Sequence, residues 1–220
     1  MTLHTGSRSI QLFVKYCLDR VIALLLLLVL APLLMIVAVS IRLVDHGPVF
    51  FYQDRIGLNR RIFSMWKFRT MIVDADRYLE SDGSVKTDRI TSIGKALRYL
   101  SLDELPQLVN ILKGEMSFVG PRPALPSHLN RYTATQARRL EMKPGITGLA
   151  QIRGRNQLKW SKRIQYDIEY IDGFSLWLDL KILLATIKVV IRREGIVLDR
   201  NPEQVDDLMP TNHRGSENDT

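Results

Sequence analysis

The sequence contains very little cysteine and histidine. It has one cysteine, Cys17, and four histidines among 220 residues. A lone cysteine excludes a disulfide within the chain, and the scattered histidines do not form a Cys/His cluster of the kind that binds zinc. No histidine is paired with a serine or cysteine for nucleophilic catalysis. Any chemistry must therefore rest on other side chains.

Acidic residues are also in the minority, because 31 Lys and Arg residues outnumber 23 Asp and Glu residues and give a formal net charge of +8. A basic protein attracts anions, which include nucleic acid, anionic lipid and phosphorylated substrates. Charge alone does not choose among these partners. The length allows one domain with a sizeable core and is short for two.

Charge of either sign is absent from residues 21–41. As a helix, this apolar run would be about 30 Å long, which is enough to cross the hydrocarbon core of a membrane. It is longer than the apolar part of a signal peptide, about 7–15 residues, and no good small-residue cleavage site is present. A membrane segment is therefore favoured over a signal peptide and over a buried helix of a soluble protein.

Pro32 lies in the middle of this run and removes a helical hydrogen bond there, so we predict a membrane break at Pro32. Basic residues flank both ends, with Lys15 and Arg20 before the run and Arg42 and Arg55 after it. Because basic flanks stay on the cytoplasmic side, a re-entrant hairpin satisfies both, whereas a spanning helix would place one outside. The residues alone leave both topologies open.

The rest of the chain predicts a small mixed domain. Two β-rich runs, Val49–Tyr52 and Ile62–Phe68, are separated by turn residues at 57–59 and predict a hairpin. Loops are predicted at 81–89 and 145–156, and helices at Asp74–Leu79, Ser92–Leu100, 101–113, Thr133–Met142, Ser161–Tyr170 and Leu176–Arg193.

The last of these helices combines an apolar face, which includes Trp177, with basic residues such as Lys181 and Lys188. Such a helix suits the surface of a membrane. It is equally suited to packing on the core of the domain, and the sequence leaves both interpretations open.

Two adjacent carboxylates, Asp103 and Glu104, open the helix predicted at 101–113. Ser101-x-x-Glu104 matches a capping box, in which the dipole of the helix stabilises a carboxylate by roughly 0.3–1 kcal/mol. The same pair can do chemistry instead, with one carboxylate on a divalent metal and the other attacking a phosphate. Such an attack needs cations, and the sequence offers Lys67, Arg69, Arg98, Arg122, Arg153 and Arg155.

Five features together resemble one known family. They are the apolar run with a central proline, KFRTM at Lys67–Met71, LSLDELPQL to VGPRP at Leu100–Pro123, KPGITGLAQIRGRN at Lys143–Asn156 and YDIEYI at Tyr166–Ile171. On these residues the chain resembles the small monotopic phosphoglycosyl transferases of the bacterial sugar transferase superfamily, from about Lys15 to about Arg193. It departs from them at Ala31-Pro32, where many relatives have Ser-Pro.

That family transfers a phosphosugar from a UDP-sugar to undecaprenyl phosphate and releases UMP. The resemblance implies that Asp103 is the nucleophile and forms an aspartyl-phosphosugar, and that Glu104, with Asp103, holds the cofactor Mg²⁺. At a helix start Asp103 should have a lowered pKa and attack without a base. The residues implied to bind the phosphates and the nucleotide sugar are Lys67, Arg98, Arg122, Gln151, Arg155 and Asp167.

The resemblance also implies an α+β fold in three parts. These are a re-entrant membrane helix-break-helix at 1–45, a mostly helical catalytic domain with a short β-hairpin and interfacial amphipathic helices at 46–198, and a disordered polar tail at 199–220. It favours a monotopic protein on the bacterial inner membrane, with the catalytic domain facing the cytoplasm. The implied partners are a UDP-sugar, undecaprenyl phosphate and membrane lipid, without nucleic acid. A homodimer, the identity of the sugar and the pathway stay open.

Two other functions compete with this one. A non-catalytic, membrane-anchored module that binds anionic lipid or nucleic acid would explain the charge and the apolar run, but not Asp103 and Glu104. Its binding should fall steeply with salt. A glycosyltransferase that transfers the sugar without its phosphate would release UDP instead of UMP.

Overall fold

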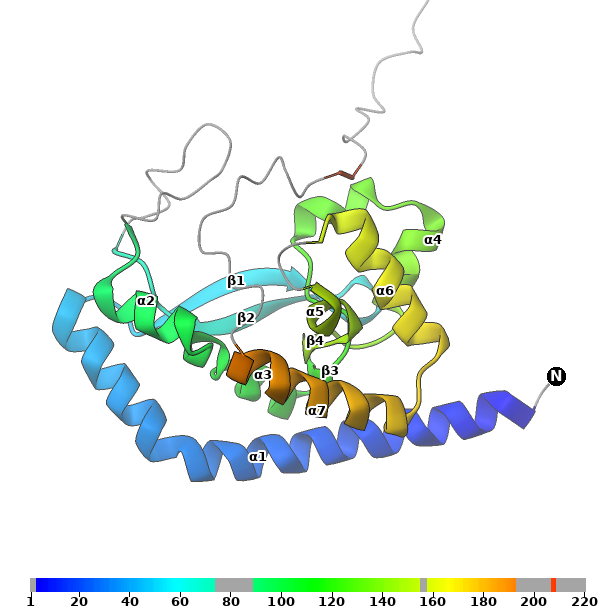
Figure 1. Ribbon diagram of the computed structural model, residues 1–220, viewed down its shortest axis with the longest axis horizontal. Coiled ribbons are helices and arrows are strands. Elements are labelled where there is room, and N and C mark those ends of the chain that lie inside the picture. Colours follow the sequence, from blue (N-terminus) through cyan, green and yellow to red (C-terminus); the bar gives the residue numbers. More distant parts are fainter. Residues whose placement is uncertain (1–2, 74–88, 155–157, 193–206, 209–220) are drawn as a thin grey trace, which may run out of the picture.

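The computed structural model describes residues 3–73, 89–154, 158–192 and 207–208 (Figure 1). A long helix, α1 (Leu3–Asp45), runs beneath a small domain of shorter helices and two two-stranded sheets. This part of the chain is mixed and mostly helical, as the sequence predicts. The helix predicted at Asp74–Leu79, the loop predicted after it and most of the predicted tail lie outside the described residues.

Helix α1 stays helical through Pro32, although proline has no N–H to donate to the helix. Figure 1 shows that the helix is bent: its first part passes under α7 (Leu176–Arg192) and its last part rises toward α2 (Ser92–Tyr99). The predicted break is thus a bend within one continuous helix.

The surface of α1 is that of a membrane anchor. Its segment Arg8–Val44 has a mean hydropathy of 3.2 in its most apolar window, of which 11% is buried. Among the described residues, it is the one helix that is long and apolar enough, by length and composition, to cross a membrane. Most of this apolar surface therefore needs an environment other than the protein itself.

The predicted hairpin is confirmed and is longer than expected on its first strand. β1 (Phe50–Ile56) pairs antiparallel with β2 (Ile62–Phe68), and the turn η1 (Leu58–Arg60) joins them. Phe51 is paired with Lys67, and Arg55 with Phe63. Paired residues share a face of a sheet, and residues four apart on one strand do so as well. Since Phe51 is paired with Lys67 and lies four residues before Arg55, Arg55 and Lys67 are on the same face.

The segment with the two carboxylates differs from its prediction. Ser101 has a φ of 57° and makes no capping bond, so the expected capping box is wrong. A 3₁₀ turn, η4 (Leu102–Glu104), comes first, and α3 (Gln107–Lys113) begins only after Pro106. A helix that ran on from Leu102 would place the Pro106 ring against the carbonyl of Leu102, which disfavours it.

The segment predicted as a loop at 145–156 is also partly regular. It contains β4 (Gly145–Thr147), which pairs in parallel with β3 (Ser117–Val119), and the short helix α5 (Leu149–Gly154). Between these strands the predicted helix Thr133–Met142 is split into α4 (Ala134–Ala137) and the 3₁₀ turn η6 (Arg138–Leu140), after an earlier turn, η5 (Pro126–Arg131).

The other predicted helices are present. α2 begins after Thr91, whose side chain accepts a bond from the Gly94 N–H. α3 ends at Gly114, which has a φ of 82°. α6 (Trp160–Asp172) and α7 (Leu176–Arg192) complete the described fold.

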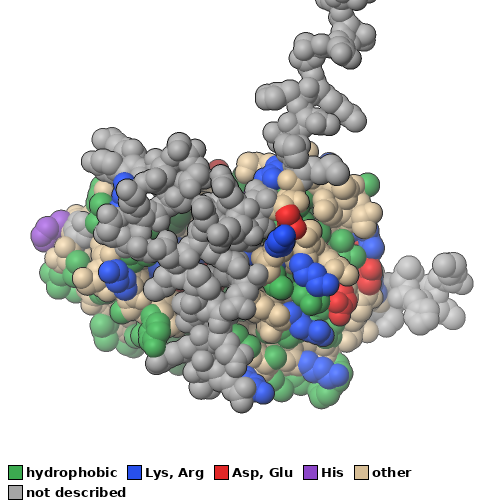
Figure 2. Space-filling view, turned by 45° about the horizontal axis from the view of Figure 1, so that its top comes forward, with side chains coloured by type: hydrophobic (Ala, Val, Ile, Leu, Met, Phe, Trp, Pro, Cys, Tyr) green, Lys and Arg blue, Asp and Glu red, His purple; other side chains and the backbone are tan. Residues whose placement is uncertain are grey.

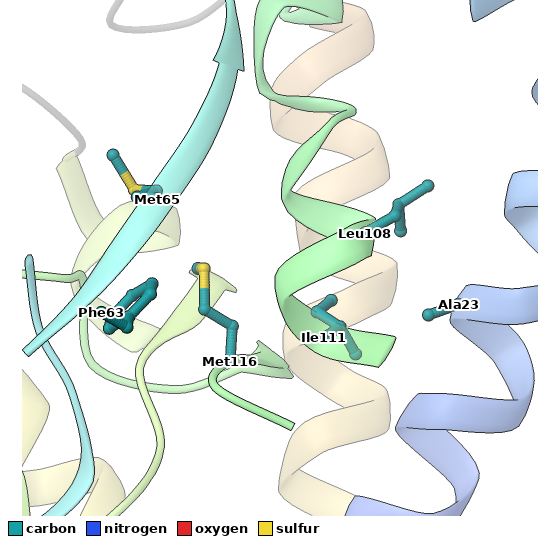
Figure 3. Close-up of a cluster of buried hydrophobic side chains, with 6 residues drawn as sticks. All are labelled: Ala23, Phe63, Met65, Leu108, Ile111 and Met116. Atoms are coloured by element: carbon teal, nitrogen blue, oxygen red, sulfur yellow. The ribbon is translucent and has the colours of Figure 1, made fainter. Parts of the chain in front are cut away.

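The core joins the middle of α1 to the domain (Figure 3). Ala23 of α1 packs with Leu108 and Ile111 of α3 and with Phe63 and Met65 of the hairpin. Met116 completes this buried cluster. The sheet, α3 and the apolar helix are therefore held together by one set of side chains.

Both halves of α1 contact the same domain. Near its start, Lys15 is buried and lies 2.6 Å from Asp179 of α7, while Asp19 accepts a 2.6 Å bond from Ser117 of β3. Near its end, Ile41 is 2% exposed in a cluster that includes Phe68, Leu97 and Val37. The domain thus holds the helix on both sides of its bend.

Helix α7 has apolar side chains on both the inside and the outside of the fold. Ile182 is 1% exposed in a buried cluster with Val119 and Ile171, whereas Trp177 is 62% exposed and Leu184 58%. The helix therefore packs partly on the core, and its exposed apolar side chains suit a membrane surface. Figure 1 shows that α7 lies beside α1. Figure 2 shows another face, on which Lys and Arg side chains gather with a few Asp and Glu among them.

Candidate active site

A cavity of about 890 Å³ lies between the hairpin, the η4 turn and helices α1, α5 and α7. Its size is in the range of roughly 300–1,000 Å³ that is usual for ligand sites. Seven of the residues that the sequence singles out line it together: Lys67, Arg69, Arg98, Asp103, Glu104, Arg122 and Gln151.

Asn110 fixes the two carboxylates relative to the hairpin. It is 0% exposed on α3, and its side-chain amide accepts from the Trp66 N–H at 3.0 Å and donates to the Ser64 carbonyl at 2.8 Å. Both partners belong to β2, the strand that carries Lys67. The element after Glu104 is thereby tied to the strand that presents Lys67.

Glu104 is held by two cations. Its Oε1 accepts from Lys67 Nζ at 2.9 Å and from Arg122 Nη2 at 3.1 Å. Burial alone would raise the pKa of Glu104, but the charges of Lys67 and Arg122 outweigh it and hold that pKa well below its usual value. Glu104 is therefore ionised throughout the physiological range of pH.

Asp103 has the opposite electrostatic surroundings. Burial raises its pKa, the negative charge of Glu104 raises it further, and Lys67 and Arg98 only partly oppose this. The expected lowering of its pKa by a helix start is thus wrong, because no α-helix begins at Asp103 and the effect of burial on its carboxyl group prevails.

Arg98 supports Asp103 from α2. Its Nε donates to Thr70 Oγ1 at 2.9 Å, and both residues line the cavity. Burial lowers the pKa of Arg98, while the charge of Asp103 opposes that shift. The charges of Arg98 and Asp103 therefore influence each other within the cavity lining.

Arg122 is presented by a segment packed tightly on β4. A Cβ on Gly120 would lie 2.3 Å from the Lys143 carbonyl, and one on Gly145 would lie 2.2 Å from the Gly120 nitrogen. Only glycine fits at these two contacts. The close approach of the two backbones sets the direction in which the chain continues to Arg122.

Gln151 lines the cavity from α5, and both polar atoms of its side chain are shielded from solvent without a hydrogen-bond partner among the described residues. An unpaired amide in such a place is costly for the free protein. A ligand group with one donor and one acceptor would pair with it, which agrees with its predicted role in substrate binding.

Asp167 and Arg155 differ from the other predicted site residues. Asp167 is 1% exposed, is not among the cavity-lining residues and lies 2.6 Å from Arg139 Nη2. Burial raises the pKa of Asp167 to about 6, and Arg139 favours its ionised form, so it is charged at neutral pH. Arg155 lies outside the described residues.

Sequence reasoning missed Arg55 as a site residue. Its Nη1 donates to the Pro123 carbonyl at 3.2 Å, and a smaller cavity brings it together with Lys67, Glu104 and Arg122. Burial lowers the pKa of Arg55 to about 10, and the charge of Arg122 adds to the shift. Side chains alternate between the two faces of a strand, so a longer predicted strand would have placed Arg55 on the face of Lys67. The predicted strand ended at Tyr52, before Arg55.

The lining of the cavity also includes apolar side chains. Leu26 and Leu30 of α1 line it, together with Leu105, Phe118 and Ile146. The charged side chains suit phosphate groups, whereas the apolar ones suit an apolar chain. The lining of one cavity thus contains both kinds of side chain, and some of the apolar ones come from the long apolar helix α1.

The carboxylates fit Mg²⁺ only with help from a ligand. The described residues contain no group of three or more His, Cys, Asp or Glu side chains that could hold a metal. Mg²⁺ in phosphoryl-transfer sites is usually bound by one or two carboxylates together with substrate phosphates and water. Asp103 and Glu104 supply that number of carboxylates beside cations that suit a diphosphate.

Comparison with known proteins agrees with this geometry. The bacterial sugar transferase family matches residues 10–193. The chain is 46% identical over 187 residues to the uncharacterized sugar transferase EpsL of Bacillus subtilis, which covers 84% of this chain and 91% of that protein.

Two longer relatives have more specific names. The UDP-glucose:undecaprenyl-phosphate glucose-1-phosphate transferase of Klebsiella pneumoniae is 43% identical over 81% of this chain and 40% of its own length. The undecaprenyl-phosphate galactose phosphotransferase of Salmonella typhimurium is 38% identical over 83% of this chain and 41% of its own length. With the family matched over most of its length, the chain belongs to the bacterial sugar transferases.

Proposed function

We propose that this enzyme transfers a phosphosugar from a UDP-sugar to undecaprenyl phosphate and releases UMP. The names of the Klebsiella and Salmonella relatives support this acceptor and this type of transfer. The observation that carries the proposal is the cavity itself. Its lining contains Asp103, Glu104 and five Lys or Arg side chains, together with apolar side chains of the long helix α1.

In the first step, an Asp103 carboxylate oxygen attacks the phosphorus atom that carries the sugar. The new bond joins that oxygen to phosphorus, and the bond from phosphorus to the bridging oxygen breaks. UMP leaves with the bridging oxygen and its electron pair. Because an ionised carboxylate attacks, no base is needed to remove a proton.

In the second step, a phosphate oxygen of undecaprenyl phosphate attacks the same phosphorus atom. The bond to Asp103 breaks, which regenerates the carboxylate and gives undecaprenyl diphosphosugar. Lys67, Arg98 and Arg122 reduce the repulsion between the anionic groups in both steps. Glu104 keeps Lys67 and Arg122 together at one edge of the cavity.

Mg²⁺ belongs to the same proposal. Glu104, with Asp103, would hold it together with the diphosphate of the donor. The ion would supply a further positive charge and stabilise the leaving UMP.

We propose a re-entrant topology for α1. Its first half is bonded to α7 and β3 and its second half is packed on β2 and α2, so both halves lie against one domain. A spanning arrangement would have to pull one half away and leave buried charges such as Lys15 unpaired, which is costly. The protein would then be monotopic and face the cytoplasm.

The test of the function is the identity of the released nucleotide. Purified protein is mixed with Mg²⁺, undecaprenyl phosphate and a panel of UDP-sugars, and nucleotides are separated by chromatography. UMP release with one of the sugars is expected, together with its loss in Asp103→Asn. Asp172→Asn, at an exposed carboxylate, is the matched control and should keep the wild-type rate. Release of UDP would contradict the proposal.

A further inference from the structure

We propose that Arg139, held by Asp167, is a positioning residue that sets the place of Arg122 in the active site. Nothing in the motifs points to Arg139, and the resemblance implied a substrate contact for Asp167. The inference rests on the proposed function, because Arg122 matters as a ligand for phosphate.

The contacts of Arg139 lead directly to Arg122. Its Nη2 donates to the Arg122 carbonyl at 2.8 Å and to Asp167 Oδ2 at 2.6 Å. Its Nη1 donates to Tyr132 Oη at 2.7 Å. The Arg122 side chain in turn reaches Glu104 at 3.1 Å. A chain of direct contacts thus runs from Asp167 to the active-site carboxylate.

Arg139 has little freedom to move. Both Arg139 and Asp167 are 1% exposed, and the guanidinium lies 5.6 Å from the Tyr132 ring centre and 5.7 Å from that of Trp160. A buried ion pair is weak evidence for stability, because an apolar pair of similar volume often serves as well. The fixed direction of the Nη2 bonds is a property that an apolar pair would not provide.

The segment around Arg122 depends on such bonds because prolines flank it. Pro121 and Pro123 have no N–H, so the segment has one backbone donor, on Arg122, and most of its backbone hydrogen bonds must be made by carbonyl groups. The Pro121 carbonyl accepts from the Gly145 N–H at 2.9 Å, and the Pro123 carbonyl accepts from Arg55. The Arg122 carbonyl between them accepts from Arg139.

This arrangement gives Arg139 a different role from that of the cations that line the cavity. Lys67, Arg98 and Arg122 line the cavity, whereas Arg139 does not and acts through the backbone of Arg122. A substitution at Arg139 should therefore weaken the binding of phosphate groups without removing any group that touches them.

A double-mutant cycle on the full chain tests this assignment. Arg139→Lys keeps the charge beside Asp167 but cannot make the same pair of Nη2 bonds. It is measured alone and in an Arg122→Ala background. Two signals are recorded: the affinity for inorganic pyrophosphate with Mg²⁺, and kcat/KM for UMP release. The unfolding temperature is recorded for every variant.

The expected result is coupling. Arg139→Lys should weaken both signals by about tenfold in the wild-type background and by less than about twofold in the Arg122→Ala background, because contacting residues are energetically coupled. Its effect on the unfolding temperature should be the same in both backgrounds. Tyr132→Phe is the matched control, because it removes the hydroxyl that accepts from Arg139 Nη1 and leaves the Nη2 bonds to Arg122 and Asp167. It should change both signals by less than about twofold.

Equal losses of pyrophosphate affinity in the two backgrounds would overturn the inference, since Arg139 would then act on stability alone. A wild-type protein that does not bind pyrophosphate would overturn it as well. A wild-type protein that binds pyrophosphate with the expected coupling but releases no UMP would contradict the proposed function and support the inference. If Arg139→Lys does not fold, Asp167→Asn takes its place in the cycle.

Discussion

Asp103 and Glu104 are neighbours in the chain, but their surroundings move their pKa values in opposite directions. Lys67 and Arg122 hold the pKa of Glu104 down, whereas burial and Glu104 raise that of Asp103. Environments that separate two adjacent carboxylates in this way are typical of sites in which each has its own task. In the proposed mechanism, the ionised Glu104 organises the cations Lys67 and Arg122, and Asp103 is the reactive group.

The first prediction concerns the pH dependence that Asp103 confers. In the proposed mechanism Asp103 attacks only when it is ionised, so kcat/KM should fall as the pH falls through the pKa of Asp103, which is raised above the usual 3.8. Arg98 favours the ionised form, so Arg98→Gln should move this acidic limb to higher pH. Lys95→Gln is the control, because Lys95 is an exposed residue of the same helix and its substitution removes the same charge. It should leave the acidic limb of the pH profile unchanged. A limb that does not move in Arg98→Gln would contradict the role of Asp103.

A second prediction at this scale concerns the metal. If Glu104 helps to hold Mg²⁺, Glu104→Gln should raise the Mg²⁺ concentration for half-maximal UMP release by about tenfold or more, as lost ligand interactions do in other metal sites. The measurement is a titration of activity with MgCl₂, with Glu141→Gln as the exposed control. An unchanged Mg²⁺ titration in Glu104→Gln would remove the metal role.

Sequence reasoning found the cavity residues that belong to long motifs and missed those that act by packing. Lys67, Asp103 and Arg122 stand in recognisable motifs, and the structure brings them together. Arg139 stands in an ordinary helical segment, and its role follows only from the fold. The pKa of Asp103 was mispredicted because a helix start was assumed and burial was not known.

At the scale of elements, the position of α3 decides the geometry of the site. Asn110 links α3 to β2, and its amide also donates to Glu115 at 2.7 Å. Gly114 then ends the helix with a positive φ, at which a Cβ would lie 2.2 Å from an Arg20 nitrogen. These contacts hold Glu104 at the distance from Lys67 that its ion pair requires.

The third prediction follows from this link. Asn110→Ala removes the partner of two part-buried backbone groups, the Ser64 carbonyl and the Trp66 N–H, so it should lower the free energy of unfolding by about 1–3 kcal/mol. UMP release per folded molecule should also fall, since the Lys67–Glu104 pair loses its support. Urea titration and activity are the measurements, and Asn130→Ala, at an exposed asparagine, is the control. Wild-type activity in folded Asn110→Ala would contradict this view.

Helices and strands were predicted correctly where the local sequence pattern agrees with the fold. The hairpin has alternating β-rich runs and a turn, and both were visible in the sequence. The segment 145–156 was misjudged because its glycines were taken as turn residues. Gly145 is in fact required by the close packing of β4 on Gly120. The capping box failed because Pro106 prevents an α-helix from starting at Leu102.

At the scale of the whole molecule, the apolar helix α1 is also part of the candidate site. Its Leu26 and Leu30 line the cavity, and much of its surface is apolar and exposed. In the proposed function, a membrane-bound acceptor would reach Asp103 along this helix. The exposed apolar face of α7 beside it enlarges the surface that would contact the membrane.

The fourth prediction concerns the topology of this anchor. In a Cys17→Ser background, single cysteines at Ile10 and Arg61 should both be protected from a membrane-impermeant thiol reagent in intact cells. Both should react after the membrane is opened, because a re-entrant helix keeps its two flanks on the cytoplasmic side. Labelling of only one of them from outside would make α1 a spanning helix.

The most direct test of the account is detection of the covalent intermediate on Asp103. The purified protein is incubated with Mg²⁺ and the UDP-sugar that supports UMP release, without undecaprenyl phosphate, and its peptides are analysed by mass spectrometry. The account predicts one phosphosugar on Asp103, close to one UMP per protein molecule, and loss of the adduct when undecaprenyl phosphate is added. An enzyme that turns over with acceptor but never carries the adduct, and releases no UMP without acceptor, would contradict the account.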